Sequence, residues 1–108
     1  MPAQKEILRF ISRFSGSIET FTSGCCYWFA HILTTRFQGH ADIVLAVVEN
    51  HFVARIKGRL YDVTGDVTEE YKNSVLVAWD QMDKYDSLQK ERIVRDCIVF
   101  CLLLDNVS

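Results

Sequence analysis

The sequence lacks any long hydrophobic run. Its longest uninterrupted apolar stretch extends from Cys97 to Leu104, far short of the roughly 20 residues that a membrane-spanning helix needs. The N-terminal stretch MPAQKEILRF also lacks the apolar segment and small-residue cleavage site of a secretory signal peptide. We therefore expect a cytoplasmic protein that does not have a membrane as a partner.

The chain has no excess of positive charge either. Its 12 Lys and Arg residues are balanced by 14 Asp and Glu residues, which gives a formal net charge of −2. Domains that bind nucleic acid usually carry a clustered basic surface, whereas the basic residues of this sequence are dispersed. Nucleic acid is therefore not expected as a partner.

Enough hydrophobic material is present to build a packed core. Hydrophobic residues make up 49% of the chain and charged residues 24%, proportions typical of a globular rather than a disordered protein. The length of 108 residues lies within the usual range for one domain. We expect a single domain over residues 1–108.

Helical periodicity is strongest in the first third of the chain. Apolar residues at helical spacing predict a helix over about 4–14. Residues 18–24, rich in Ser, Thr and Gly, predict a loop. A second helix is predicted from Cys25 or Cys26 to Phe37, because an apolar stripe follows with the i, i+3, i+4 spacing of a helix face.

A last helix is predicted from about Asp86, where Gln89 completes a capping pair, to about Leu104. It is apolar almost all round, so it is either central or part of a homodimer interface. Cys97 and Cys101 lie four residues apart on it, but a zinc site needs about four ligands at recognisable spacings. We expect these two cysteines to pack in the core, with no metal and no cofactor.

The middle of the chain changes to the pattern of strands. Strands are predicted over 41–48, 51–56 and 59–64, the last two joined by a Lys57-Gly58 hairpin turn. Residues 74–79 predict a fourth strand or a short helix. This order of elements predicts an α+β domain in which helices pack on one face of a three- or four-stranded antiparallel sheet.

His51 and Asp62 lie on neighbouring strands of this predicted sheet. If Lys57-Gly58 are the central residues of the turn, Ile56 pairs with Arg59. Since side chains alternate between faces with a period of two, His51 and Asp62 then project to the same face as diagonal neighbours. An imidazole and a carboxylate are thereby brought within hydrogen-bonding reach.

Cys26 supplies a nucleophile at the start of the second helix. It shares the buried stripe of that helix, so it faces the sheet. The free N–H groups of a first helical turn favour an anion and can stabilise an oxyanion. Thiol catalysis requires such a nucleophile, a base and a group that orients the base, which indicates Cys26, His51 and Asp62. Cys25 remains the alternative nucleophile.

The motifs around these residues resemble a known family. The segment GCCYWFA (24–30) is similar to the Gly-x-Cys-aromatic helix start of papain-like and transglutaminase-like folds. A His-Phe strand followed by a Tyr-Asp strand resembles the transglutaminase-like pattern, and Cys26 to Gly65 resembles small phage and bacterial proteins with these motifs. The resemblance implies a small papain-like or transglutaminase-like core with a Cys-His-Asp acyl-transfer site at Cys26, His51 and Asp62.

Together these patterns favour a small cysteine-dependent enzyme. It would act on an amide or acyl bond of a protein or peptide substrate as a peptidase, deamidase or acyl transferase. The alternative is a catalytically inactive interaction module on the same fold, phage-related and acting on a host protein.

Overall fold

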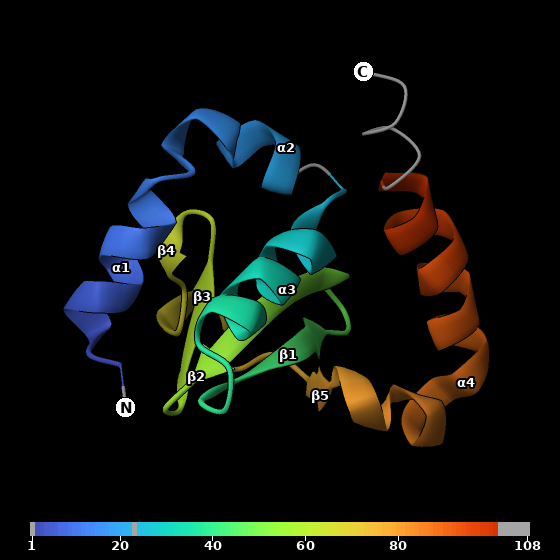
Figure 1. Cartoon of the computed structure of the whole chain (residues 1–108). Helices are drawn as coiled ribbons and strands as arrows, with labels where there is room; N and C mark the ends of the chain where they lie inside the picture. The colour runs from blue at the N-terminus through green and yellow to red at the C-terminus, as the bar shows by residue number, and fades with distance from the viewer. Residues whose placement is uncertain (1, 23, 102–108) are drawn as a thin grey trace.

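The computed structural model describes residues 2–22 and 24–101, which form the α+β domain that the sequence predicts (Figure 1). Three helices precede the first strand, and a kinked helix follows the last one. The helical elements and strands, in chain order, are α1 (Gln4–Ser12), η1 (Ser15–Ser17), α2 (Ile18–Thr22), α3 (Cys26–Arg36), β1 (Ala41–Ala46), β2 (His51–Ile56), β3 (Arg59–Asp62), β4 (Gly65–Asp66), η2 (Glu69–Tyr71), β5 (Leu76–Ala78), η3 (Trp79–Gln81), α4 (Met82–Ile93) and η4 (Val94–Val99).

The sheet is antiparallel and has five strands in the order β4-β3-β2-β1-β5, so that β2 is central. The predicted hairpin is confirmed, because Ile56 pairs with Arg59 across its turn. Lys57 and Gly58 have φ values of 53° and 77°, the positive values that a two-residue hairpin of matching twist requires. This register places His51 and Asp62 on the same face.

The edges of the sheet are formed by short strands. β5 pairs with β1 and is followed directly by the 3-10 turn η3. Of the two alternatives predicted for residues 74–79, a strand or a short helix, the strand is therefore confirmed. β4 has two residues and pairs with β3. No sequence periodicity predicts β4, because two residues are too few to show one.

The helices α1 and α3 are confirmed, but the predicted loop at 18–24 is wrong. Ile18–Thr22 forms α2. Phe21 explains the difference, since its ring centroid lies 6.1 Å from that of Phe14 and 5.2 Å from that of Phe29. These aromatic contacts order a segment whose Ser and Thr residues have little helical propensity of their own.

The C-terminal helix α4 begins at Met82, four residues before the predicted start at Asp86, so the predicted capping pair lies inside the helix. The N–H of Gln89 donates to Oδ1 of Asp86 at 3.0 Å, and the backbone of Asp86 is non-helical, with φ −161°. α4 is therefore kinked at Asp86, where its two helical pieces join. The last described turns, Val94–Val99, form a π-helix. The predicted continuation to Leu104 lies outside the described residues.

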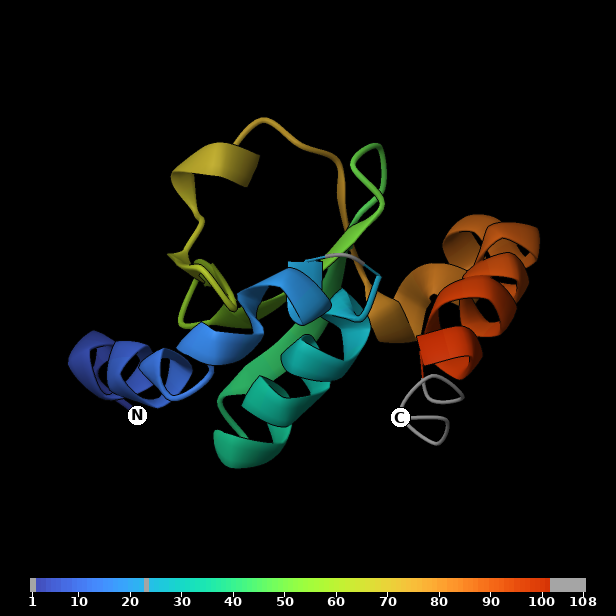
Figure 2. The same cartoon turned by 90° about the horizontal axis from the view of Figure 1, so that it is seen from above.

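Both faces of the sheet are covered. α1, α2 and α3 lie on one face, and the segment containing η2 crosses the other (Figure 2). Along β2 and β3, every second side chain points to the first face and fills it, while the side chains between them point to the opposite face. The buried residues of this larger cluster are Ile7, Ile11, Phe29, Leu33, Phe37, Ala54, Ile56, Tyr61 and Val63.

A disulfide joins the start of α3 to the C-terminal segment. Cys25 is bonded to Cys101, across a sequence separation of 76 residues. The indole Nε1–H of Trp28 donates to the carbonyl of Ile98 at 3.0 Å, which adds a second link. The prediction that Cys101 only packs in the core is therefore wrong, because folding brings its sulfur to that of Cys25. Cys97 has a free thiol.

Loss of this disulfide should lower the free energy of unfolding. Closing a long loop in the unfolded chain stabilises a protein by about 2–4 kcal/mol, so we expect Cys101→Ser to have a loss of that order in urea denaturation. Cys97→Ser is the matched control, because it changes a free thiol of the same helical segment, and it should cost about 1 kcal/mol or less. Equal losses for the two variants would contradict the role given to the disulfide.

Candidate active site

Cys26 is the first residue of α3 and lies beside the first residues of β2. The backbone N–H of Phe52 donates to Sγ of Cys26 at 3.4 Å. The backbone N–H groups of Trp28 and Phe29 both donate hydrogen bonds to the carbonyl oxygen of Cys25, with N···O distances of 3.1 and 3.4 Å. The N–H of Cys26 thus belongs to the first helical turn, whose N–H groups are not used by the hydrogen-bonded ladder of the helix.

Cys25 does not provide the alternative nucleophile in this structure. It is 7% exposed and its sulfur is in the disulfide with Cys101. Cys26 is half-buried and has a free thiol. Of the two neighbouring cysteines that the sequence left open, only Cys26 therefore has a sulfur able to react as a thiolate.

His51 and Asp62 meet at the end of the sheet. Nε2 of His51, the first residue of β2, lies 2.9 Å from Oδ2 of Asp62, the last residue of β3. Oδ1 of Asp62 accepts hydrogen bonds from the backbone N–H of Thr64 at 2.8 Å and from its hydroxyl at 2.5 Å. Both oxygens are thereby engaged, which fixes the carboxylate in the orientation that holds the imidazole.

Hydrogen bonding keeps both members of this pair charged. Burial lowers the pKa of His51, but hydrogen bonds to Asp62 and to Cys26 outweigh burial and raise the pKa to about 9. Burial also raises the pKa of Asp62, while hydrogen bonds from His51 and Thr64 outweigh it, so the pKa falls below its ordinary value. At neutral pH the pair is an imidazolium and a carboxylate.

Cys26 also lies near His51. Its Sγ contacts the N–H of Phe52, the residue that follows His51, and Cys26 is one of the groups that raise the pKa of His51. Of the three residues that the sequence singled out, His51 and Asp62 are thus in direct contact, and Cys26 lies beside the first residues of the strand that carries His51.

Tyr71 covers His51 and was not identified from the sequence. The two rings are stacked, with centroids 5.8 Å apart and planes 18° from parallel. Burial raises the pKa of Tyr71, so its hydroxyl is neutral at neutral pH. Tyr71 comes from η2, on the long connection between β4 and β5, and no local pattern reveals that this connection returns to His51.

Aromatic side chains form a wall next to Cys26. The ring centroid of Phe52 lies 5.2 Å from that of Tyr27 and 4.9 Å from that of Trp79. These edge-to-face contacts hold the start of α3 against the sheet. Cys97 packs at the same cluster, and burial raises the pKa of its thiol. The two free thiols therefore lie in different electrostatic surroundings.

Within residues 2–22 and 24–101, no three His, Cys, Asp or Glu side chains lie close enough together to hold a metal ion. Over the same ranges, no helix has the length and apolarity that crossing a lipid bilayer demands.

The fold and this cluster define a small α+β protein in which a thiol, an imidazole and a carboxylate gather at one end of the sheet. A family model described as Phage YunG-like protein matches residues 8–98. This range includes most of the chain, so the protein belongs to that phage-related family. Comparison with curated proteins and with solved structures gives no match.

The charge of His51 predicts how stability depends on pH. Its pKa is about 9 in the folded protein against 6.5 for an unperturbed imidazole, so folding favours the protonated form. The resulting stabilisation is complete below pH 6.5 and is lost as the pH rises through about 9. We expect NMR titration of the His51 ring to give a pKa near 9, and Asp62→Asn to lower it toward 6.5. A wild-type value near 6.5 would contradict the assigned contacts.

Proposed function

We propose that the protein is a small cysteine-dependent enzyme that acts on an amide or acyl bond, with a papain-like or transglutaminase-like arrangement of Cys26, His51 and Asp62. The observation that carries the proposal is the 2.9 Å contact between Nε2 of His51 and Oδ2 of Asp62, with Cys26 beside the start of the same strand, where its Sγ accepts from the N–H of Phe52 at 3.4 Å. A base oriented by a carboxylate and placed next to a thiol is the arrangement that nucleophilic catalysis requires.

In the proposed reaction, the thiolate of Cys26 attacks the carbonyl carbon of the substrate. A carbon–sulfur bond forms, and the imidazolium of His51 gives its proton to the leaving nitrogen as the carbon–nitrogen bond breaks. His51, now neutral, then takes a proton from water or from an acceptor amine, which attacks the thioester and releases Cys26. Asp62 keeps the ring oriented and stabilises its positive charge at both stages.

The developing oxyanion needs a donor, and the start of α3 supplies one. The backbone N–H of Cys26 lies outside the helical ladder, and the helix dipole adds positive potential at this end. An N–H group in such a position stabilises the tetrahedral intermediate most when it is already oriented before the reaction. The aromatic contacts around Tyr27 supply that rigidity.

We propose a protein or peptide substrate and a cytoplasmic setting. A reducing compartment keeps a thiol such as Cys26 in the form that nucleophilic attack needs. A disulfide is rare in such a compartment, and the one beside Cys26 is shielded from reductants, because Cys25 is 7% and Cys101 3% exposed. The two kinds of sulfur can therefore coexist in one protein.

Acylation by 4-nitrophenyl acetate tests the reaction directly. Peptide mapping by mass spectrometry should find acetyl groups on Cys26 about 100-fold sooner than on Cys97, because acid–base catalysis by a neighbouring imidazole contributes about 10²–10⁴-fold. Cys97 is an internal control within the same molecule, since its thiol is free and has no imidazole partner in the described contacts. Turnover should follow, since the thioester is hydrolysed.

Two variants separate catalysis from simple thiol chemistry. His51→Ala should slow acetylation of Cys26 by about 100-fold and leave that of Cys97 unchanged, with the fold checked by circular dichroism. Asp62→Asn, which keeps the shape of the side chain, should produce a smaller loss in the same direction. Equal labelling of Cys26 and Cys97, or no effect of either variant, would leave the inactive interaction module as the better account.

The C-terminal helical segment supports a second proposal, a homodimer. Leu88 is 77%, Phe100 56% and Tyr85 54% exposed, although all three are large apolar or aromatic residues. Side chains of this kind at a surface are typical of residues that a second subunit covers. The proposed partner is another copy of this chain.

Sedimentation tests the dimer. We expect the wild-type protein to sediment as a dimer at micromolar concentration and Leu88→Glu to sediment as a monomer, because a charge would have to be buried at the interface. Lys84→Gln, at an exposed site of the same helix, is the control and should stay dimeric. A wild-type protein that is monomeric throughout would exclude this interface.

A further inference from the structure

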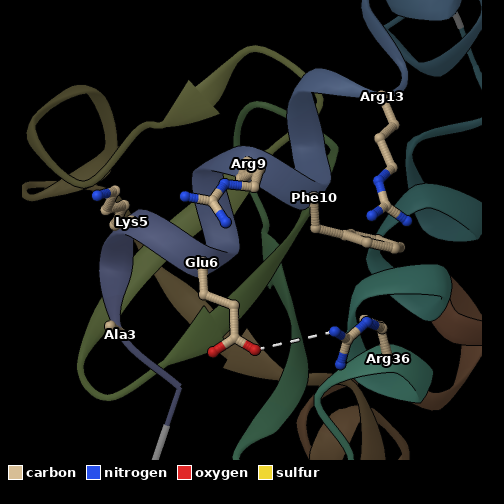
Figure 3. Close-up of a pocket in the computed structure, with 7 residues that line it drawn as sticks. All are labelled: Ala3, Lys5, Glu6, Arg9, Phe10, Arg13 and Arg36. Atoms are coloured by element: carbon tan, nitrogen blue, oxygen red, sulfur yellow. Dashed lines mark ion pairs between the residues drawn. The ribbon is translucent and has the colours of Figure 1, made fainter.

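Basic side chains converge on a pocket at the far end of α3 from Cys26. The pocket lies between α1 and the C-terminal end of α3 and has a volume of about 450 Å³, within the usual range for ligand sites. Its basic residues are Lys5, Arg9, Arg13 and Arg36, and Phe10 forms part of its floor (Figure 3). A chain with a net charge of −2 thus concentrates four of its cations around one hollow.

The positive charge of this pocket is poorly compensated. Arg36 has one ion pair, in which its Nη2 lies 3.8 Å from Oε2 of Glu6 (Figure 3). Among the described residues, Arg9 and Arg13 have no carboxylate partner. Guanidinium groups without partners are prepared to bind a carboxylate or phosphate through their paired N–H donors.

Two of these guanidinium groups share one aromatic ring. Cζ of Arg13 lies 5.7 Å and Cζ of Arg36 5.6 Å from the ring centroid of Phe10. The cation–π contacts hold the two groups in place from α1 and from α3. They also keep like charges near one another, a repulsion that an anion bound between them would relieve.

We propose that this pocket binds an acidic peptide segment, with carboxylates of the segment on Arg9 and Arg13. Lys5, Arg9 and Arg13 are spaced by four residues, which places them about 6 Å apart along a helix. Alternate side chains of an extended peptide are about 6.6 Å apart. A strand with acidic residues at alternate positions therefore has carboxylates at a similar spacing, and the long side chains of Arg9 and Arg13 can each reach one of them.

The features of the pocket favour a peptide over a nucleic acid. Glu6 is one of its lining residues, and the C-terminal end of α3 adds the negative end of a helix dipole. Both reduce the positive potential of the pocket, which weakens binding of the dense charge of a phosphate backbone more than binding of a few separated carboxylates. The net charge of −2 also gives no long-range attraction for nucleic acid.

This binding site is separate from the thiol chemistry. Cys26 begins α3 and Arg36 ends it, so the two lie about 15 Å apart along the helix axis. Binding in the pocket does not depend on Cys26, His51 or Asp62. The pocket selects a partner by charge, whether or not the other end of the helix carries out a reaction.

Fluorescence anisotropy with a labelled peptide of alternating Glu and Ala residues tests the proposal. We expect saturable binding to the full-length protein at low salt and its loss in about 1 M salt, where the Debye length falls to about 3 Å. Arg9→Gln/Arg13→Gln should weaken binding about tenfold. Lys57→Gln/Lys84→Gln removes the same charge from exposed sites outside the pocket and should change it less than about twofold.

Two further binding measurements distinguish an acidic peptide from a nucleic acid as the partner. The same peptide with Gln in place of Glu should not bind, because its carboxylates are gone. A single-stranded oligonucleotide of matched charge should bind more weakly than the acidic peptide. No binding of the acidic peptide, equal losses in the two double variants, or tighter binding of the oligonucleotide with the same dependence on Arg9 and Arg13 would overturn the proposal. None of these binding measurements depends on acylation of Cys26, so the proposed peptide site and the proposed enzymatic activity can fail separately.

Discussion

The hydrogen bond between His51 and Asp62 is the interaction on which the candidate site depends. It joins the first residue of β2 to the last residue of β3 and lies where both side chains are largely buried, 14% and 10% exposed. An unpaired charge in such a place is strongly unfavourable, whereas a charged pair with further hydrogen bonds is tolerated. Thr64 supplies those further bonds to Asp62. Each partner therefore explains why the other can be buried and charged.

The rest of the fold holds a sulfur against this pair. α3 places Cys26 at the sheet end, the N–H of Phe52 contacts its Sγ, and the Cys25–Cys101 disulfide fixes the start of the helix to the C-terminal segment. The opposite end of the same helix contributes Arg36 to the basic pocket. α3 thus links the cysteine beside His51 at one of its ends to the basic pocket at the other, in a protein of a phage-related family.

Local sequence patterns predict those parts of the structure that depend on residues close together in the chain. The Lys57-Gly58 turn sets the register of β2 and β3, and the register brings His51 to Asp62, so both followed from the sequence. α2 did not, because Phe21 is ordered by rings on other elements. The disulfide and the stacking of Tyr71 on His51 depend on segments that are distant in the chain, and neither spacing nor composition specifies such contacts.

A double-mutant cycle measures the central interaction most directly. The free energies of unfolding of the wild-type protein, His51→Ala, Asp62→Ala and the double variant, all near neutral pH, give the coupling energy between the two side chains. A hydrogen bond between charged groups at this depth predicts a coupling of about 1.5–3 kcal/mol. A coupling near zero would show that the imidazole and the carboxylate do not hold each other, and the account of the site built on them would then be wrong.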